Sequence, residues 1–271
     1  MPPSVLITRA SRGIGRALAL HYAREGSQLA LIGRDDARLE AVAGECRKLG
    51  VGVSLNALDV RNRTEMASRI TALDDVTPID LVIANAGTMA GTPARGTVEP
   101  ADAAHAVIET NILGVLNTVQ PLLTTMIARR RGQIAIVSSI AGFIPLPDSP
   151  SYCASKAAVL NYGLSLRTLL VSYGIAVSEV CPGYVTTPMM SRESGAKPFA
   201  MSPERAARLI VKGLDRNRAV IAFPYLGLSQ SCPLTLSQCE GLRNTSSGKF
   251  DALAVCRPGS CWPGGRTNSV S

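Results

Sequence analysis

The sequence predicts an α/β fold, a doubly wound parallel sheet of about seven strands in a single domain. Short apolar runs that suit buried strands alternate with helix-forming segments almost throughout the chain. The first apolar run leads into a glycine-rich turn and then a helix-forming segment, which is typical of sheets that bind phosphate groups. With 271 residues, 46% of them hydrophobic, the chain is long enough for one sizeable core.

The first half of the chain is expected to alternate strands and helices. Each predicted strand is a short apolar run bounded by turn residues: Ser4–Thr8, Gln28–Gly33, residues 51–58 and residues 80–84. The helices between them are expected at residues 16–25, 35–49 and 64–73. Gly26 ends the first helix, as glycine commonly does.

The second half continues the same alternation. Residues 101–130 form a long helical stretch that we expect to break near Asn111 and Gly114, before a strand at residues 133–138. A proline-rich loop then leads to a helix at residues 152–173, which stops at Gly174. The remaining predicted elements are a strand at residues 175–180, a helix at 203–217 and a strand at 219–223.

Two segments of the second half carry little regular pattern. Residues 190–201 combine Gly, Pro, Ser and charge, and are expected to form a mobile lid. Residues 229–271 are rich in Ser, Gly, Cys, Asn and Pro, without helical or strand periodicity. We therefore expect a domain at residues 1–228 and a poorly ordered C-terminal tail at 229–271. A scrambled translation of the terminus would have the same composition.

Composition limits the classes of partner. The formal charge of +8 favours a solvated basic surface over nucleic-acid binding, and it would also suit an anionic cofactor. No apolar run approaches the ~20 residues that span a bilayer, and no signal peptide is recognised, so a cytoplasmic protein is expected. The seven cysteines form no Cys-x-x-Cys pair and the two histidines lack ligand spacing, so neither a metal site nor a disulfide framework is predicted.

The stretch from residue 139 to residue 156 carries the predicted chemistry. Tyr152 and Lys156 are four residues apart and share one face of a helix. A lysine ammonium beside a phenol lowers the pKa of the phenol, which makes it a general acid/base near neutral pH. Ser139 follows a strand, at the edge of the sheet where ligands bind, and its hydroxyl can bond to a substrate oxygen. A Tyr-x-x-x-Lys pair on a solvated helix face is the alternative.

Two other polar residues each have two interpretations. Asn111 lies in an apolar helical segment, so its amide either bridges a water or backbone carbonyl beside the site or is satisfied within the core. Asp59 ends the third strand, where it either meets an adenine ring or caps the following helix.

Taken together, these motifs resemble the short-chain dehydrogenase/reductase family, over about residues 4–226. The motifs that carry the resemblance are the glycine turn, Asn85-Ala86-Gly87, Asn111, Ser139, Tyr152, Lys156 and Pro182-Gly183. The resemblance implies a Rossmann-type fold and an oxidoreductase that moves hydride between a nicotinamide and a carbonyl or alcohol. It further implies that Tyr152 exchanges the proton, Lys156 also holds the nicotinamide ribose, and Ser139 positions the substrate oxygen. Asn111 would support a proton relay.

The resemblance also implies a set of cofactor contacts and an assembly. Besides Tyr152 and Lys156, the implied contacts are Thr8, Ser11, Gly13, Ile14, Gly15, Asp59, Val60, Asn85, Ala86, Gly87, Pro182, Gly183, Val185 and Thr187. The last two would meet the nicotinamide carboxamide. The segments 111–127 and 157–170 are apolar around much of their circumference, and family members commonly pair these helices, so a homodimer or homotetramer is expected.

One position departs from the family pattern. The family's turn usually begins Thr-Gly, and here the glycine is replaced by Arg9. A side chain at this position is costly if φ is positive, so Arg9 is expected to weaken cofactor binding; the alternative is that its side chain reaches outward towards phosphate. The alternative function is therefore a catalytically impaired relative that binds only nucleotide or a protein partner.

Charge predicts NADP(H) in preference to NAD(H). Enzymes that prefer NAD commonly carry an acid at the end of the second strand, where this chain has Gly33-Arg34. Arg34, together with Arg12 in the turn, can form charged hydrogen bonds to a 2′-phosphate. Asp35 and Asp36 oppose this interpretation unless they begin the next helix.

Overall fold

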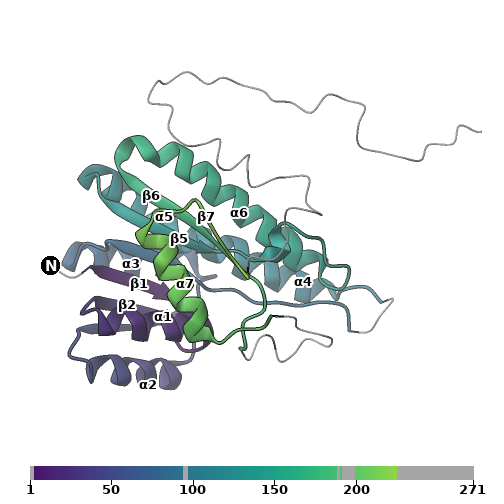
Figure 1. Ribbon diagram of the computed structural model, residues 1–271, viewed down its shortest axis with the longest axis horizontal. Helices are drawn as coiled ribbons and strands as arrows, with labels where there is room; N and C mark the ends of the chain where they lie inside the picture. The colour runs from purple at the N-terminus through teal and green to yellow at the C-terminus, as the bar shows by residue number, and fades with distance from the viewer. Residues whose placement is uncertain (1–2, 94–96, 188–189, 191–198, 225–271) are drawn as a thin grey trace, which may run out of the picture. The chain divides into compact units, whose positions relative to one another are not determined.

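A seven-stranded, wholly parallel sheet organises the structure, a computed structural model that describes residues 3–93, 97–187, 190 and 199–224 (Figure 1). The strand order is β3-β2-β1-β4-β5-β6-β7, and helices cover both faces. The order reverses beside β1, which pairs with both β2 and β4. This confirms the doubly wound fold predicted from the alternation of strands and helices.

The predicted strands and helices are all present, with ends shifted by a few residues at most. The strands are β1 (Ser4–Thr8), β2 (Gln28–Gly33), β3 (Val53–Ala57), β4 (Leu81–Ala84), β5 (Gly132–Val137), β6 (Ile175–Pro182) and β7 (Val220–Phe223). The helices are α1 (Gly13–Arg24), α2 (Asp36–Arg47), α3 (Arg63–Val76), α4 (Ala101–Ile108), α5 (Gly114–Arg129), α6 (Pro150–Leu170) and α7 (Pro203–Asp215). Short helical turns lie at η1 (Glu109–Leu113), η2 (Ile140–Gly142) and η3 (Val171–Tyr173).

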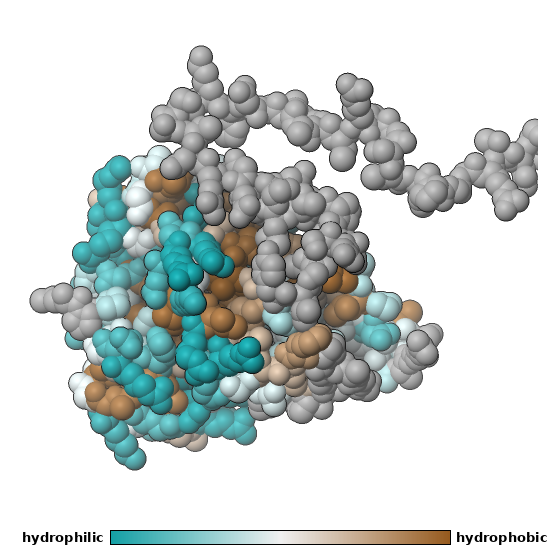
Figure 2. Space-filling model, viewed as in Figure 1, coloured by the Kyte–Doolittle hydropathy of each residue, from teal (hydrophilic) through white to brown (hydrophobic). Residues whose placement is uncertain are grey.

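The core consists of two apolar layers, one on each face of the sheet. Alternate residues of a strand point to opposite faces, so Val5 and Ile7 of β1 join one layer and Leu6 joins the other. Helices α1, α2 and α7 cover the first face, while α3, α5 and α6 cover the second. Helix α7 shows the expected division, with buried Ile210 and Leu214 below and a polar outer face that is visible in Figure 2.

The break expected near Asn111 is a π-helical turn. Helix α4 passes through η1 into α5 without a gap, so the segment turns more widely there but does not stop. Gly114 begins α5 directly against Val60, and a Cβ on this glycine would lie 2.7 Å from Val60 Cγ2. The glycine therefore permits close contact between α5 and the loop after β3.

Residues 101–129 are long and apolar enough to cross a membrane, judged by length and composition alone. A core helix can pass the same test, and α5 buries Val115, Val119, Leu122 and Met126 within the domain. The expectation that the chain has no membrane span therefore stays a prediction.

Two predicted segments lie largely or wholly outside the residues that the structure describes. Most of the expected lid at residues 190–201 lies outside the described residues, and the expected tail at 229–271 lies outside them entirely. Among the residues that the structure describes, Cys46, Cys153 and Cys181 are not in disulfides.

Candidate active site

Two adjoining clefts lie at the carboxyl ends of the strands, where ligands bind in open α/β sheets. The larger cleft, of about 1120 Å³, is lined by predicted cofactor residues: Ser11, Arg12, Arg34, Asp59, Val60, Ala86 and Gly87. The smaller cleft holds the predicted catalytic group and the rest of the nicotinamide end: Arg12, Gly13, Ile14, Asn85, Gly87, Ser139, Tyr152, Lys156, Pro182, Gly183, Val185 and Thr187. Thr8, Gly15 and Asn111 line neither cleft.

Tyr152 and Lys156 lie in the first turns of α6 and face the smaller cleft together. Lys156 Nζ lies 5.8 Å from the centroid of the Tyr152 ring and donates a 2.8 Å hydrogen bond to the carbonyl oxygen of Val137. Only 4% of Lys156 is exposed. The pKa of Lys156 is lowered to about 8, chiefly by burial and in smaller part by the Arg9 cation, while Glu179 opposes the fall. This lysine is therefore fixed in place, and its charge depends on its neighbours.

The two serines at the end of β5 connect three elements around this pair. Ser138 Oγ donates a 2.8 Å hydrogen bond to the carbonyl oxygen of Lys156. Ser139 Oγ accepts a bond from the Ala141 amide at 3.1 Å and donates one to the Pro182 carbonyl at 3.4 Å. Ser139 is buried but lines the smaller cleft beside Tyr152, as the motif spacing predicted.

Asn111 satisfies its amide within the protein. Its Oδ1 accepts a 2.7 Å bond from the Thr88 amide, and its Nδ2 donates 2.9 Å bonds to the Thr88 carbonyl and to Ser155 Oγ. A Cβ on Gly87 would lie 3.4 Å from both Asn111 Oδ1 and Lys156 Nζ. Asn111 is therefore buried directly behind the cleft, and both of its interpretations stay open: it bonds to a backbone carbonyl beside the site, and its amide is satisfied within the core.

The glycine turn after β1 is as tight as predicted. Gly13 has φ +57°, in the left-handed region, and a Cβ on Gly15 would lie 2.4 Å from the Arg9 carbonyl oxygen. Thr8 Oγ1 accepts bonds from the Asn85 and Ala86 amides at 3.0 and 2.9 Å. Thr8 and Gly15 thus fix the turn from behind.

Arg9 occupies the left-handed region, with φ +51°, as the family pattern predicts for its position. Its guanidinium donates a hydrogen bond to the carbonyl oxygen of Gly87. Arg9 lines both clefts, so this side chain lies where the two clefts join. The backbone conformation followed from the sequence, but the direction of the side chain did not.

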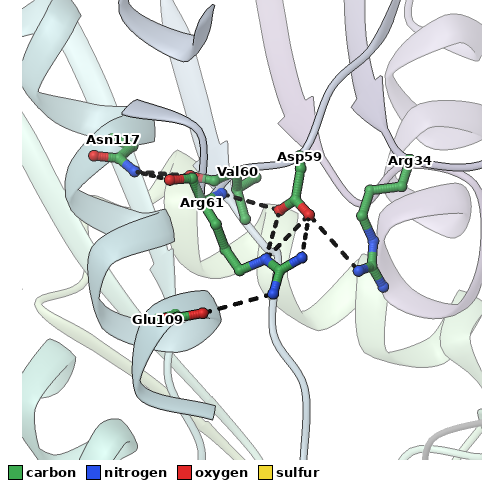
Figure 3. A network of polar contacts seen from close by, with 6 residues as sticks. All are labelled: Arg34, Asp59, Val60, Arg61, Glu109 and Asn117. Carbon is green, nitrogen blue, oxygen red and sulfur yellow. Dashed lines mark hydrogen bonds and ion pairs between the residues drawn. The ribbon is translucent and has the colours of Figure 1, made fainter. Parts of the chain in front are cut away.

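Asp59 is the centre of a polar network at the far end of the larger cleft (Figure 3). Its carboxylate accepts a 2.7 Å bond from Arg61 Nη2 and lies 3.8 Å from Arg34 Nη1. The hydrogen bonds from Arg61 hold the pKa of Asp59 below its usual range. Arg61 also reaches Glu109 at 3.6 Å, and Asn117 Nδ2 donates a 2.8 Å bond to the Val60 carbonyl.

The helix-cap interpretation of Asp59 is wrong, because Asn62 caps α3 by accepting a bond from the Glu65 amide. Asp35, in contrast, does cap α2, by accepting a 3.1 Å bond from the Arg38 amide, as the sequence indicated. Arg61 was not singled out from the sequence. Its position two residues after the end-of-strand Asp59 was the available signal.

The chain beyond β6 closes the smaller cleft. Val185 forms a parallel bridge with Met201, and the Thr186 amide donates a 2.8 Å bond to the Met201 carbonyl. Thr187 lies over the glycine turn, since a Cβ on Gly13 would be 3.0 Å from Thr187 Cγ2. Further side chains, mostly apolar, also line this cleft: Met89, Ile140, Ile144, Leu146, Tyr184 and Met190. Across the described part of the chain, no three His, Cys, Asp or Glu side chains are grouped to hold a metal ion.

Comparisons with known proteins agree with this geometry. The family model described as short chain dehydrogenase matches residues 3–197. An uncharacterized oxidoreductase of Myxococcus xanthus (strain DK1622) is 36% identical over 223 residues, which cover 82% of this chain and 87% of that protein. A short-chain dehydrogenase from Sphingobium yanoikuyae in complex with NADPH has a TM-score of 0.78 at 27% identity, covering 89% and 93% of the two chains. A 3-oxoacyl-[acyl-carrier protein] reductase with bound NAD from Brucella melitensis has a TM-score of 0.72 at 26% identity, covering 82% and 89%.

Proposed function

Because the chain belongs to the short-chain dehydrogenase/reductase family, and is thus an NAD(P)-dependent dehydrogenase or reductase, we propose that it moves hydride between NADP(H) and a carbonyl/alcohol pair. Tyr152 is the proposed general acid/base. The observation that carries this proposal is the placement of Tyr152, Lys156 and Ser139 around one cleft that adjoins the glycine turn.

The chain's own residues supply the proton and the electrostatics, and the nicotinamide, when bound, supplies or accepts the hydride. Tyr152 donates its hydroxyl proton to the carbonyl oxygen during reduction and recovers it during oxidation. The ammonium of Lys156, fixed by the Val137 carbonyl, favours the phenolate form of Tyr152. The Ser139 hydroxyl bonds to the substrate oxygen as charge develops there.

The residues present fit a dinucleotide. The glycine turn offers backbone N–H groups at the start of α1, with Gly13 in the left-handed region and no room for a side chain at Gly15. Lys156 is the residue that would hold the nicotinamide ribose, and Val185 and Thr187 would meet the carboxamide. Arg9 departs from the family pattern, which has a glycine at this position. Its guanidinium would either contact the pyrophosphate or have to move away from it.

Charge supports NADP(H) in preference to NAD(H). Arg61 binds Asp59 at 2.7 Å, whereas Arg34 lies 3.8 Å from that carboxylate and is 67% exposed. The N–H donors of Arg34 are therefore largely available to a 2′-phosphate. Arg12 lines the same cleft. One solved relative carries NADPH and another carries NAD, so this charge argument decides the proposal.

A homodimer or homotetramer is the proposed assembly. Leu113, the last residue of η1 just before α5, and Leu169, near the end of α6, are 48% and 62% exposed although both are large apolar side chains. Pairing of α5 and α6 with a second copy would cover them. A cytoplasmic location and a small-molecule substrate complete the proposal.

Arg9 supports a second candidate, a relative that binds nucleotide or a protein without efficient turnover. Its backbone is strained, and its guanidinium is bonded to Gly87 at the junction of the clefts. Fluorescence titration with NADPH, followed by an NADPH-oxidation screen over ketones and aldehydes, separates the two. Turnover of a carbonyl by the wild type supports the enzyme, while NADPH binding without turnover in the wild type, with turnover gained in Arg9→Gly, supports the second candidate.

A further inference from the structure

Glu179 is a buried carboxylic acid in the middle of the sheet. It lies on β6, between β5 and β7, and is 0% exposed. Neither carboxyl oxygen has a hydrogen-bond partner among the residues that the structure describes. Glutamate is almost never fully buried unless it is paired, because removing its charge from water is costly. A nearby cation is therefore the expected reason for its position.

The side chain of Glu179 points into the layer between the sheet and α6. It lies opposite Ile136 of β5, which packs in that layer, and a Cβ on Gly163 of α6 would lie 1.6 Å from Glu179 Oε1. The missing side chain of Gly163 thus makes room for the carboxyl group. Lys156 is seven residues before Gly163, two helical turns along the same face of α6. The next carbonyl along β5, that of Val137, accepts the bond from Lys156 Nζ.

Among the described residues, few other charged or titratable groups lie around this pair. Arg9 approaches Lys156 from the turn after β1, and Cys181 follows two residues after Glu179 on β6. Arg167, further along α6, donates its bonds to the Val177 carbonyl and to Asn217. Burial raises the pKa of Glu179 and Lys156 opposes that rise, while Glu179 opposes the fall in the pKa of Lys156. Each group therefore favours the charged form of the other.

We propose that Glu179 is a positioning residue, the buried counter-charge that keeps Lys156 protonated beside Tyr152 although the Arg9 guanidinium lies close by. The two buried groups titrate together. When a proton leaves Glu179, the pair becomes an ammonium and a carboxylate, and Lys156 keeps its charge. Without a carboxyl group at residue 179, the proton that leaves this buried pair must come from Lys156 itself. The catalytic part of this inference rests on the proposed function, but the electrostatic part does not.

The test follows the titration of Lys156 in the full-length, cofactor-free protein. Lysine is labelled with ¹³C at Cε, its chemical shift is followed against pH, and Lys156→Arg assigns the signal. In Glu179→Gln, which keeps the shape but cannot ionise, the Lys156 midpoint should fall by about one pH unit, a tenfold change in proton affinity. Adding Arg9→Gly should make this fall smaller, because the opposing cation is gone. Glu45→Gln, which removes a carboxylate paired with Arg16, is the matched control and should change nothing.

A second variant separates the loss of charge from the hydrogen bonds that a glutamine can form. Glu179→Leu fills the same space with an apolar group and should lower the Lys156 midpoint equally. Because it leaves the buried Lys156 charge without its partner, it can destabilise the protein, and its melting transition is measured first. An unchanged midpoint in Glu179→Gln and Glu179→Leu, with native melting transitions, would overturn the proposal. With a substrate in hand, the alkaline limb of kcat for alcohol oxidation should move to lower pH in Glu179→Gln and return towards wild type in Glu179→Asp. If no variant turns over any substrate, the proposed function fails while the chemical-shift titration still tests the charge pair.

Discussion

The guanidinium of Arg9 donates a hydrogen bond to the carbonyl oxygen of Gly87, and this bond joins the turns that follow β1 and β4. These two strands are neighbours in the sheet, and both turns line the clefts. A side chain therefore lies across the junction between the cofactor end and the catalytic end of the site. How well this chain binds a dinucleotide depends on whether the Arg9 guanidinium moves away from the pyrophosphate or forms hydrogen bonds with it.

Arg9→Gly should stabilise the protein and strengthen NADPH binding. A non-glycine residue in the left-handed region costs about 1 kcal/mol, which for a domain of this size is a melting-temperature rise of about 2–4 °C. Arg130 has the same φ, +51°, at the end of α5, far from the glycine turn in the chain. Arg130→Gly is thus the matched control, with unchanged NADPH affinity. Weaker NADPH binding in Arg9→Gly would mean that Arg9 itself holds the phosphates.

Arg34→Ala should weaken NADPH binding by roughly ten- to a hundredfold and change NADH binding far less. A well-formed charged hydrogen bond contributes about 1.5–3 kcal/mol. NADH has no 2′-phosphate, so it does not form this bond and loses nothing when Arg34 is removed. Arg12→Ala should also weaken NADPH binding more than NADH binding. Added salt should reduce the preference of the wild type for NADPH over NADH, because salt screens an exposed charge pair. Arg38→Ala, which removes an exposed arginine paired with Asp35 on α2, is the control. Equal losses for both cofactors in Arg34→Ala would remove the case for NADP(H).

The stability of the protein should depend on pH through Glu179. Burial raises the pKa of this carboxyl in the folded state, so the folded chain binds the proton more tightly than the unfolded chain. Its contribution to stability is fully present below the unfolded pKa of about 4.3 and is lost as the pH rises through the folded pKa. The melting temperature of Glu179→Gln minus that of wild type should therefore increase from pH 5 to pH 7.5. A constant difference across this range contradicts the raised pKa.

Much of the fold was predictable because each buried parallel strand is a continuous apolar run and each helix has its own spacing. The rule that ligands bind at the carboxyl ends of such strands also predicted the position of Ser139, and the four-residue spacing of Tyr152 and Lys156 predicted that they share one helix face. Most of what was missed depends on side-chain contacts between distant segments. The direction of Arg9 and the burial of Glu179 beneath α6 have no signature in local sequence, whereas the pairing of Asp59 with Arg61 is local and had their two-residue spacing as its signal.

The π-helical turn at η1 illustrates the same limit. An apolar segment interrupted by Asn111 indicated a break, because a polar amide needs partners that a helix interior does not offer. The partners lie on Thr88, 23 residues earlier, and on Ser155, 44 residues later, so the helix widens to place the amide and continues.

The central claim is that Tyr152 supplies the proton in a hydride transfer that uses NADPH. The most direct test is NADPH oxidation by wild type and Tyr152→Phe with one carbonyl substrate, under single-turnover conditions where chemistry limits the rate. The NADPH dissociation constant should stay within about twofold, because only the hydroxyl is removed, whereas the rate should fall by about 10²–10⁴-fold. A Tyr152→Phe protein that reduces the substrate at the wild-type rate would contradict the assignment.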